Sequence, residues 1–208
     1  MTESATPTAP LTVQEAAHAR RSVRQYAPTP IPREALQQIL ETLALAPSAF
    51  NTQPWRVIVV EEPALKAQLA AVAYNQRQVT SAPTVLVFYT DMADVMATVS
   101  EVVHPGMPAD QQANMQAMIL KSLTAMNDHD RAGWGAVQGN IGLGFLLLAA
   151  AGLGYQTSAM AGFQPDGVKA LLGIPASAHV NALVAIGTGT EPGFPHHRHP
   201  VARFTTFR

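Results

Sequence analysis

The feature that most constrains the fold of this chain is a long apolar segment, from Gly133 to Ala151. A surface helix carries one apolar stripe and one polar face, whereas this segment is apolar on nearly every side. We therefore expect a helix buried all round, either at the centre of the fold or at a seam between two subunits. Its most apolar part, Ile141 to Leu153, is too short to span a bilayer, so no membrane partner is expected.

The composition also indicates more apolar surface than one small domain readily buries. Of 208 residues, 48% are hydrophobic and only 13% are charged. The length suits one domain, and chains with few charges often hide spare apolar area in a subunit interface. A net charge of -1 argues against a nucleic-acid partner. The absence of cysteine excludes disulfides, thiolate catalysis and cysteine metal sites.

The first ten residues, MTESATPTAP, are small and polar. They lack the basic start and apolar core of a signal peptide. We expect a disordered tail over residues 1–10, a single domain over residues 11–208, and a cytoplasmic protein.

Helical and strand-like patterns alternate along the rest of the chain. Thr12 and Glu15 form a possible capping box at the start of the first helix, and Pro32 begins the next. Further helices are expected near residues 63–72, 92–131 (interrupted around 106–108) and 168–172. The expected strands are Trp55–Val60, Thr84–Tyr89, Gln156–Met160 and Val180–Gly187. This alternation predicts an α/β or α+β sandwich.

Two clusters in the first quarter of the chain carry candidate binding chemistry. The run from Arg20 to Arg24 packs three guanidinium groups and the Ser22 hydroxyl into five residues, a combination suited to phosphate. The loop from Ala46 to Trp55 is dense in small polar residues that can hydrogen-bond a planar heterocycle. Taken singly, a solvated charged turn and an ordinary loop explain these runs as well.

Two further clusters lie later in the chain. Tyr74 to Gln78 ends a helix with amide side chains, which suit the edge of a pyrimidine-like ring but also suit a plain polar helix end. The tail His196-His197-Arg198-His199 could bind phosphate, face water or bind a metal. No metal is expected, because no acidic or cysteine partner stands at metal-site spacing.

Several common catalytic patterns are missing. There is no GxGxxG after a strand and no Walker A motif, and the glycines from Gly139 to Gly144 lie inside the apolar helix. No Ser/His/Asp order or pair of carboxylates stands out either. Demanding chemistry would therefore have to come from a bound cofactor.

Taken in order, the four clusters resemble the nitroreductase family of flavoenzymes, from about Val13 to Val201. RRSVRQY resembles the family's opening phosphate motif, and APSAFNTQPW resembles its PSxxNxQPW loop. YNQRQ before a strand and MAGF after the next-to-last strand also stand where the family has them. The resemblance implies an α+β fold, namely a three-layer α/β/α sandwich around a mostly antiparallel sheet, assembled as an intertwined homodimer.

The resemblance also implies one FMN at each interface site and NAD(P)H as co-substrate. Hydride would pass from the nicotinamide through flavin N5 to an electron-poor small molecule, such as a nitroaromatic or a quinone, in a ping-pong order. The chemistry would be borne by the flavin, with Arg24 and the backbone N–H of Gly162 as electrostatic helpers. Phe50 and residues 92–132 are candidate walls of the acceptor slot.

By the same resemblance, the FMN-binding residues fall into groups. The phosphate is expected at Arg20, Arg21, Ser22, His196 and Arg198, and the pyrimidine edge at Arg24, Asn75 and Gln78. The other subunit is expected to reach the ring with Pro47, Ser48, Ala49 and Asn51. Flavin N5 is expected near Met160, Ala161 and Gly162, and the ribityl chain or ring edge near Gln138.

This chain departs from the common family pattern at three positions. Many members have Lys where Gln78 stands and Glu where Ala161 stands, so the positive charge near the ring falls to Arg24. His196 replaces a Lys in the tail, which would make phosphate binding sensitive to pH. The remaining alternatives are an FMN-binding redox sensor or flavin carrier, a helical interaction protein without cofactor, and an enzyme of the same fold with other chemistry, such as reductive dehalogenation or flavin fragmentation.

Overall fold

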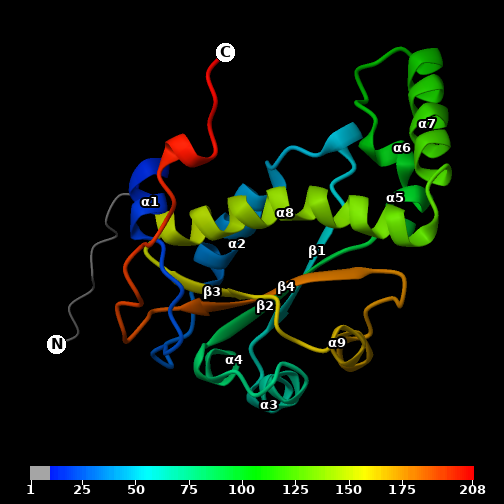
Figure 1. The fold of residues 1–208 in the computed structure, drawn as a ribbon. Helices are drawn as coiled ribbons and strands as arrows, with labels where there is room; N and C mark the ends of the chain where they lie inside the picture. The colour runs from blue at the N-terminus through cyan, green and yellow to red at the C-terminus, as the bar shows by residue number, and fades with distance from the viewer. Residues whose placement is uncertain (1–9) are drawn as a thin grey trace.

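The computed structural model of the protein describes residues 10–208, and Figure 1 shows how they are arranged. In chain order the elements are α1 (Val13–Ala19), α2 (Arg33–Ala44), β1 (Trp55–Val60), α3 (Pro63–Val72), α4 (Arg77–Ser81), β2 (Thr84–Thr90), α5 (Met92–Ala97), α6 (Val99–Val102), α7 (Ala109–Thr124), α8 (Asp128–Gly152), β3 (Gln156–Met160), α9 (Pro165–Leu172) and β4 (His179–Gly187). The tail expected to be disordered lies outside the described residues except for Pro10.

The sequence patterns place most of these elements correctly. The capping box is present, because the Thr12 hydroxyl accepts from the Glu15 N–H while the Glu15 carboxylate accepts from Thr12. The four strands fall where they were expected. The short helix α4 was not expected, and the region near 92–131 divides into three helices before α8 begins at Asp128.

The sheet has four strands in the order β1-β2-β4-β3, and every neighbouring pair is antiparallel. Trp55 pairs with Thr90 across β1 and β2, and Thr84 pairs with Ile186 across β2 and β4. The expected antiparallel sheet of an α+β protein is therefore confirmed.

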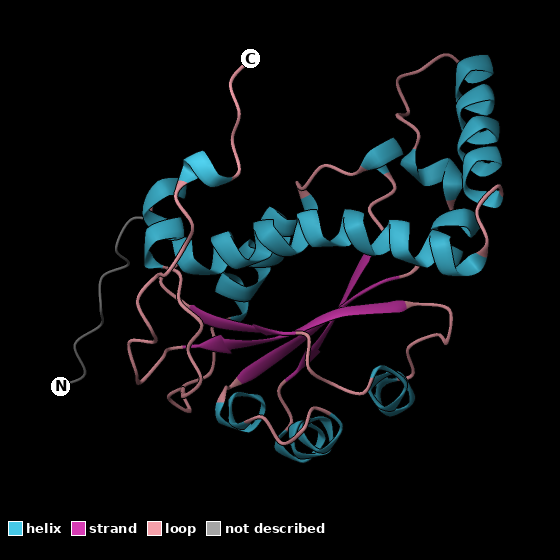
Figure 2. Cartoon of the chain, in the orientation of Figure 1, coloured by secondary structure: helices cyan, strands magenta, loops and turns pink. Residues whose placement is uncertain are grey.

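Helices cover both faces of this sheet, which gives three layers (Figure 2). Side chains alternate across a strand. On β2, Val85 and Val87 join the apolar cluster that includes residues of α3, α4 and α9, whereas Leu86 and Phe88 join the cluster formed with α2 and α8. The sandwich implied by the resemblance is confirmed.

Helix α8 lies unusually close to its neighbours in the core. A Cβ added at Gly139 would overlap the Thr90 methyl group, and one at Gly142 would lie 2.8 Å from Leu43 Cδ1. Since real Cβ contacts do not reach such distances, these glycines allow the helix backbone to approach the sheet and α2. The apolar segment is therefore the core helix of the sandwich.

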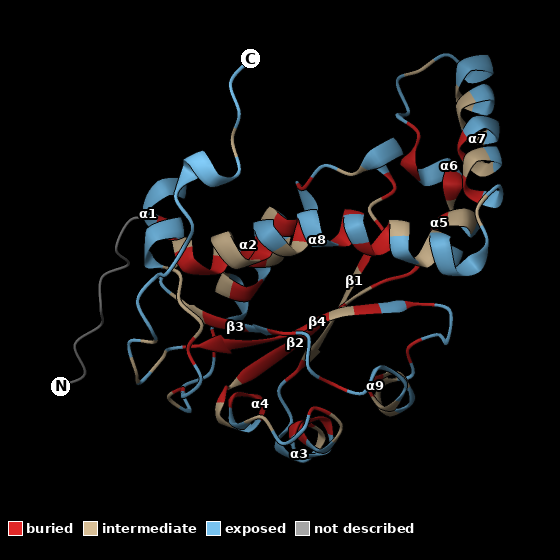
Figure 3. Cartoon of the chain, viewed as in Figure 1, coloured by how far each residue is buried: buried red, intermediate tan, exposed pale blue. Residues whose placement is uncertain are grey.

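The expectation that this helix is buried on every side is wrong for the single chain. A stripe along α8 faces outward, with Val137 62%, Ile141 40% and Phe145 37% exposed. These positions recur at helical spacing and share one face. Figure 3 shows the alternation of buried and exposed residues along α8. The sheet and α2 cover only one side of the helix, so the outer stripe has no cover among the described residues.

The apolar helix is longer than the segment Ile141–Leu153, which the sequence analysis judged too short to span a bilayer. The helix has 25 residues, and by length and composition it would be long enough to cross a membrane. Core helices of soluble proteins meet the same criteria of length and composition. Within the chain, 39% of the most apolar 18-residue window of α8 is buried. The close contacts at Gly139 and Gly142 identify it as a core helix.

Helices α5, α6 and α7 form an excursion between β2 and α8, and α7 projects away from the sandwich (Figure 1). They have their own apolar cluster, in which Ile119 and Leu123 of α7 are buried against Val95 of α5 and Val102 of α6. The outer face of α7 is exposed (Figure 3). This excursion lies next to the loop that precedes β1, because Asn51 Nδ2 donates to the Val102 carbonyl at 3.1 Å.

Candidate functional site

A cationic cavity forms where the segment after α1 meets the C-terminal tail. It has a volume of about 190 Å³. The residues that line it are Arg20, Arg21, Ser22, Arg24, Phe194, Pro195, His196 and Arg198. The two clusters that the sequence predicts to bind phosphate are thus brought together, although more than 170 residues separate them along the chain.

The cations of this cavity have no acidic partners among the described residues. The ion pairs within residues 10–208 involve other arginines, and none includes Arg20, Arg21 or Arg198. Burial lowers the pKa of Arg20, and the nearby charges of Arg198 and Arg21 lower it further. Bringing like charges together without a counterion is unfavourable. The donor set therefore fits a phosphate, which would relieve the repulsion and accept several charged hydrogen bonds.

His196 lies inside this cavity. Its Nε2 is 2.8 Å from the Arg20 carbonyl oxygen and also contacts Arg21 Nη1. The two contacts require opposite states of that nitrogen, since it must donate to the carbonyl but accept from the guanidinium. Only one of them is a hydrogen bond at a time. His196 thus anchors the tail to the segment after α1 whichever state it adopts.

Glu191 is a residue of this region that the sequence analysis missed. Its carboxylate accepts from the Arg24 backbone N–H at 2.8 Å and pairs with Arg77 at 3.1 Å. It borders a second cavity of about 370 Å³ next to the first, lined in addition by Pro192, Gly193 and Phe194. No local pattern marks Glu191, because its partners lie more than 100 residues away.

The loop before β1 has a strained backbone. Phe50, Asn51 and Gln53 all have positive φ, at 54°, 55° and 42°. This left-handed region costs residues with a Cβ about 1–3 kcal/mol each, and such strain clusters at functional sites. Pro54 follows Gln53, which disfavours a compact conformation at Gln53 still further. The loop keeps this shape only because contacts around it enforce it.

Hydrogen bonds inside the chain use several groups that the resemblance assigns to the flavin. The Ser48 hydroxyl accepts from Gln53 N–H at 2.9 Å. The Gln138 side-chain carbonyl, 9% exposed, accepts from Ala49 N–H at 2.9 Å. The amide of Asn51 is bonded to the carbonyl of Val102. In this chain, then, these side chains shape the loop, and the exposed outer surface around Phe50 is the part that a ligand could contact.

The turn between α3 and α4 has a second strained pair. Tyr74 and Asn75 have positive φ, and the next residue, Gln76, donates to the Gly162 carbonyl at 2.6 Å. The turn and the segment after β3 are therefore held side by side. Gln78 is only 5% exposed and donates to the Gln76 side chain at 3.2 Å, so it supports this contact from inside.

The cationic cavity and the strained loop lie apart in one chain. Ser22 of the cavity pairs with Thr157 on β3, beyond the end of α8, whereas the loop bonds to Gln138 in the middle of α8. Fourteen residues of helix lie between Gln138 and the end of α8 at Gly152, about 20 Å along the axis. The cationic cavity and the cavity beside the loop, which is lined by Thr52, Gln53 and Arg56 among others, share no lining residue. The two groups of residues therefore form separate sites within one chain.

Within residues 10–208 there is no group of three or more His, Cys, Asp or Glu side chains that could hold a metal. The features with binding chemistry are a phosphate-sized cationic cavity and two strained segments on an α+β sandwich. The donor set of the cavity suits a phosphorylated ligand.

Comparisons with known proteins identify the family. The Nitroreductase family model matches residues 17–188. A Thermus thermophilus protein named NADH dehydrogenase is 41% identical over 95% of this chain and 97% of its own length. YdgI of Bacillus subtilis, described as an NAD(P)H nitroreductase, is 31% identical over 88% of this chain and 90% of its own.

A solved structure agrees with this assignment. A protein from Exiguobacterium sibiricum, described as a nitroreductase and crystallised with FMN, superposes with a TM-score of 0.88 at 26% identity, covering 98% of this chain and 100% of its own. The chain belongs to the nitroreductase family, as the resemblance indicated, and it is an oxidoreductase.

Proposed function

We propose that this protein is an FMN-dependent oxidoreductase that passes a hydride from NAD(P)H to an electron-poor small molecule, such as a nitroaromatic or a quinone. The observation that carries the proposal is the cationic cavity, in which Arg20, Arg21 and Arg198 converge without a carboxylate among the described residues. The FMN complex of the Exiguobacterium relative and the nicotinamide-linked names of the other relatives support the choice of cofactor and reductant.

The residues of the cavity would hold the phosphate of FMN. Arg20 and Arg198 supply planar guanidinium donors suited to phosphate oxygens, and the Ser22 hydroxyl supplies a short one. His196 joins the tail to this group through the Arg20 carbonyl. The phosphate and the tail would therefore stabilise one another.

The two strained segments would hold the flavin ring. FMN supplies the redox chemistry when bound. We assign Arg24 and Asn75 to the pyrimidine edge, where a positive charge favours the reduced cofactor. We assign the backbone around Met160, Ala161 and Gly162 to the region of N5, with Gln76 holding the Gly162 carbonyl in place. Gln78 acts from behind this contact, because it is buried.

The site would be completed by a second subunit. In our proposal, Pro47, Ser48, Ala49 and Asn51 approach the ring from the partner, with Gln138 fixing the loop through Ala49. The outward stripe of α8, with Val137, Ile141 and Phe145, supports such an interface because exposed apolar residues along one helix face favour association.

The C-terminal segment supports an intertwined arrangement. It leaves the body of the molecule (Figure 1), and Phe204 and Phe207 are 73% and 92% exposed. Aromatic residues contribute strongly to interfaces. We propose that these rings are covered in the dimer.

The acceptor would enter beside the excursion of helices. Phe50 is 41% exposed, and its ring lies 6.4 Å from that of Trp134 on α8. Methionines from α5 and α7 pack nearby in the same excursion and adapt to ligands of different shape. The proposal therefore places a broad, apolar acceptor slot here, in a cytoplasmic enzyme.

The test is the absorbance and turnover of the purified protein. We expect a yellow protein with flavin bands, which NAD(P)H bleaches and a quinone or nitroaromatic restores. A colourless protein that also fails to bind added FMN would contradict the proposal. A yellow protein that no acceptor reoxidises would favour the alternative of a redox sensor or flavin carrier.

A further inference from the structure

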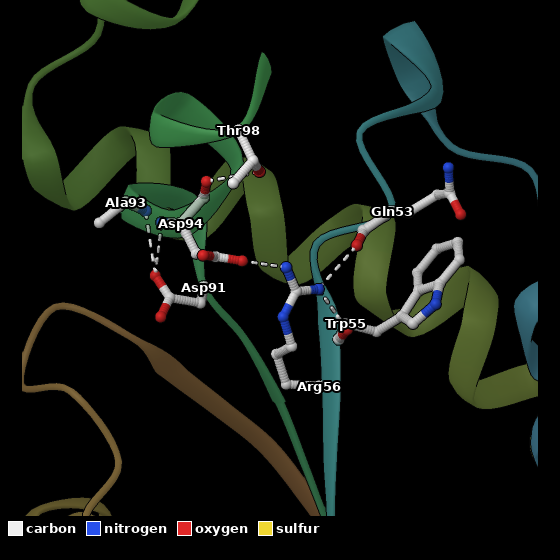
Figure 4. Close-up of polar contacts among 7 residues, drawn as sticks. All are labelled: Gln53, Trp55, Arg56, Asp91, Ala93, Asp94 and Thr98. Carbon is white, nitrogen blue, oxygen red and sulfur yellow. Dashed lines mark hydrogen bonds and ion pairs between the residues drawn. The ribbon is translucent and has the colours of Figure 1, made fainter. Parts of the chain in front are cut away.

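Arg56 connects the strained loop to the helical excursion (Figure 4). It is the second residue of β1, and its Nη1 donates to the Gln53 carbonyl at 3.1 Å and to the Trp55 carbonyl at 2.8 Å. Its Nη2 pairs with the Asp94 carboxylate on α5. One guanidinium therefore joins the end of the loop, the start of β1 and the first turn of α5.

Asp94, the partner of Arg56, is itself held firmly. Asp91 caps α5, and its carboxylate accepts from the backbone N–H groups of Ala93 and Asp94, both at 3.1 Å. The Thr98 hydroxyl donates to the Asp94 carbonyl at 2.8 Å. The Asp91 N–H in turn donates to the Pro54 carbonyl at 3.0 Å. The backbone that carries the Asp94 carboxylate is thus fixed relative to the end of the loop.

The ion pair alone would be an ordinary surface contact. The side chains of Arg56 and Asp94 are 37% and 43% exposed, and pairs of this exposure contribute little to stability. The unusual feature is the second contact of the same guanidinium, with the Gln53 carbonyl. Gln53 is a left-handed residue directly before a proline, where the backbone is most strained.

We propose that Arg56 is a positioning residue: paired with Asp94, it keeps Phe50, Asn51 and Gln53 in their left-handed conformation and ties the loop to α5. The loop then presents one fixed surface to the flavin ring and to the acceptor slot. This last step rests on the proposed FMN site, whereas the holding of the loop does not.

A lysine could not do the same. Arg56 uses both ends of a planar fork to reach two carbonyls on one side and a carboxylate on the other. A lysine would retain the charge and could pair with Asp94, but it would not bridge all three acceptors in one geometry. The variant Arg56→Lys therefore tests whether the positive charge alone is enough or the planar fork is needed.

The first experiment measures the loop directly, by hydrogen exchange of the full-length protein. We expect Arg56→Gln to speed exchange of the amides of residues 49–53 by about tenfold or more, the usual effect of losing a charged hydrogen bond. Exchange in β2 and β4 should stay unchanged. Asp94→Asn should act in the same direction and Arg56→Lys less strongly. Arg33→Gln, which removes the exposed pair with Glu61, is the matched control.

The second experiment measures FMN affinity and acceptor kinetics of the same variants. Arg56→Gln should weaken FMN binding and lower kcat/KM for the acceptor by about tenfold, with partial recovery in Arg56→Lys. Unchanged loop exchange would overturn the proposal, and so would faster exchange with unaltered FMN binding and kinetics. If Arg56→Gln does not fold, Asp94→Asn and Arg56→Lys decide by the same measurements. If the wild-type protein binds no FMN, the FMN proposal fails and the exchange data still decide whether Arg56 holds the loop.

Discussion

The side-chain carbonyl of Gln138, in the middle of α8, accepts a hydrogen bond from the backbone N–H of Ala49 at 2.9 Å. Gln138 is only 9% exposed, so this single contact fastens the strained loop to the core helix. The loop and α8 are 89 residues apart in sequence, and the contact makes them one structural unit.

We predict that Gln138→Leu destabilises the protein by about 1–3 kcal/mol, because the half-buried Ala49 N–H loses its acceptor. Urea unfolding at a fixed protein concentration measures the change. Gln38→Leu on α2, an exposed position, is the control and should change the free energy of unfolding by less than about 0.5 kcal/mol. Equal effects of the two substitutions would show that the contact does not hold the loop.

We predict that Gly139→Ala destabilises the protein by about 1–3 kcal/mol, although alanine is the better helix former. The added methyl group would overlap the Thr90 side chain and push α8 away from the sheet. Gly133→Ala, where no atom lies within 4 Å, should instead be neutral or stabilising by up to about 1 kcal/mol. Thermal unfolding of both variants tests the close packing of α8.

We predict that Arg20→Ala weakens FMN binding by about 2–3 kcal/mol, the loss expected for a charged hydrogen bond to phosphate. Burial, and then the positive charges of Arg198 and Arg21, lower the pKa of Arg20, and a bound anion would offset that repulsion. Fluorescence titration of the apoprotein with FMN gives the affinity. Riboflavin, which lacks the phosphate, should bind both proteins equally. An unchanged FMN affinity would show that the phosphate lies elsewhere.

We predict that Ile141→Asp converts the proposed dimer to monomers at micromolar concentration. Each subunit of a symmetric dimer would bury the new charge, at a cost of several kcal/mol. Sedimentation velocity measures the outcome. Gln111→Asp on the exposed face of α7 is the control and should leave the assembly unchanged. If the Ile141→Asp protein is still a dimer, the interface does not use the stripe on α8.

We predict that the protein loses stability above about pH 10, partly through Tyr26. Burial, and then the charge of Glu191, raise the pKa of this phenol well above its ordinary value near 10. A group whose pKa is raised in the folded state stabilises it fully below the unfolded pKa, and this contribution falls as pH rises toward the folded pKa.

The variant Tyr26→Phe isolates this effect. It should lose about 1 kcal/mol at neutral pH, because the hydroxyl donates to the Val23 carbonyl at 2.8 Å. Above pH 10 it should lose less further stability than the wild type. Urea unfolding at pH 8 and pH 11 makes the comparison. Parallel losses in both proteins would assign the alkaline sensitivity to other groups, such as Tyr89 and Tyr155, whose pKa values burial also raises.

Local sequence determined the elements and the chemistry near each of them. Periodicity marked α2 and the strands, and a capping box marked α1. The cluster from Arg20 to Arg24 signalled an anion site because its residues are neighbours in the chain. The Nitroreductase family match over residues 17–188 confirms the family that these clusters indicated.

Tertiary structure decided whatever depends on distant partners. The apolar helix is covered on one side only, because packing against the sheet and α2 leaves Val137 and Ile141 exposed. Composition alone does not distinguish a helix in the core of one chain from a helix at a subunit interface. Glu191, Arg56 and Asp94 carried no signal, because each is defined by a group that the fold brings beside it. Left-handed residues such as Gln53 were also invisible, since only the contacts around the loop compel that conformation.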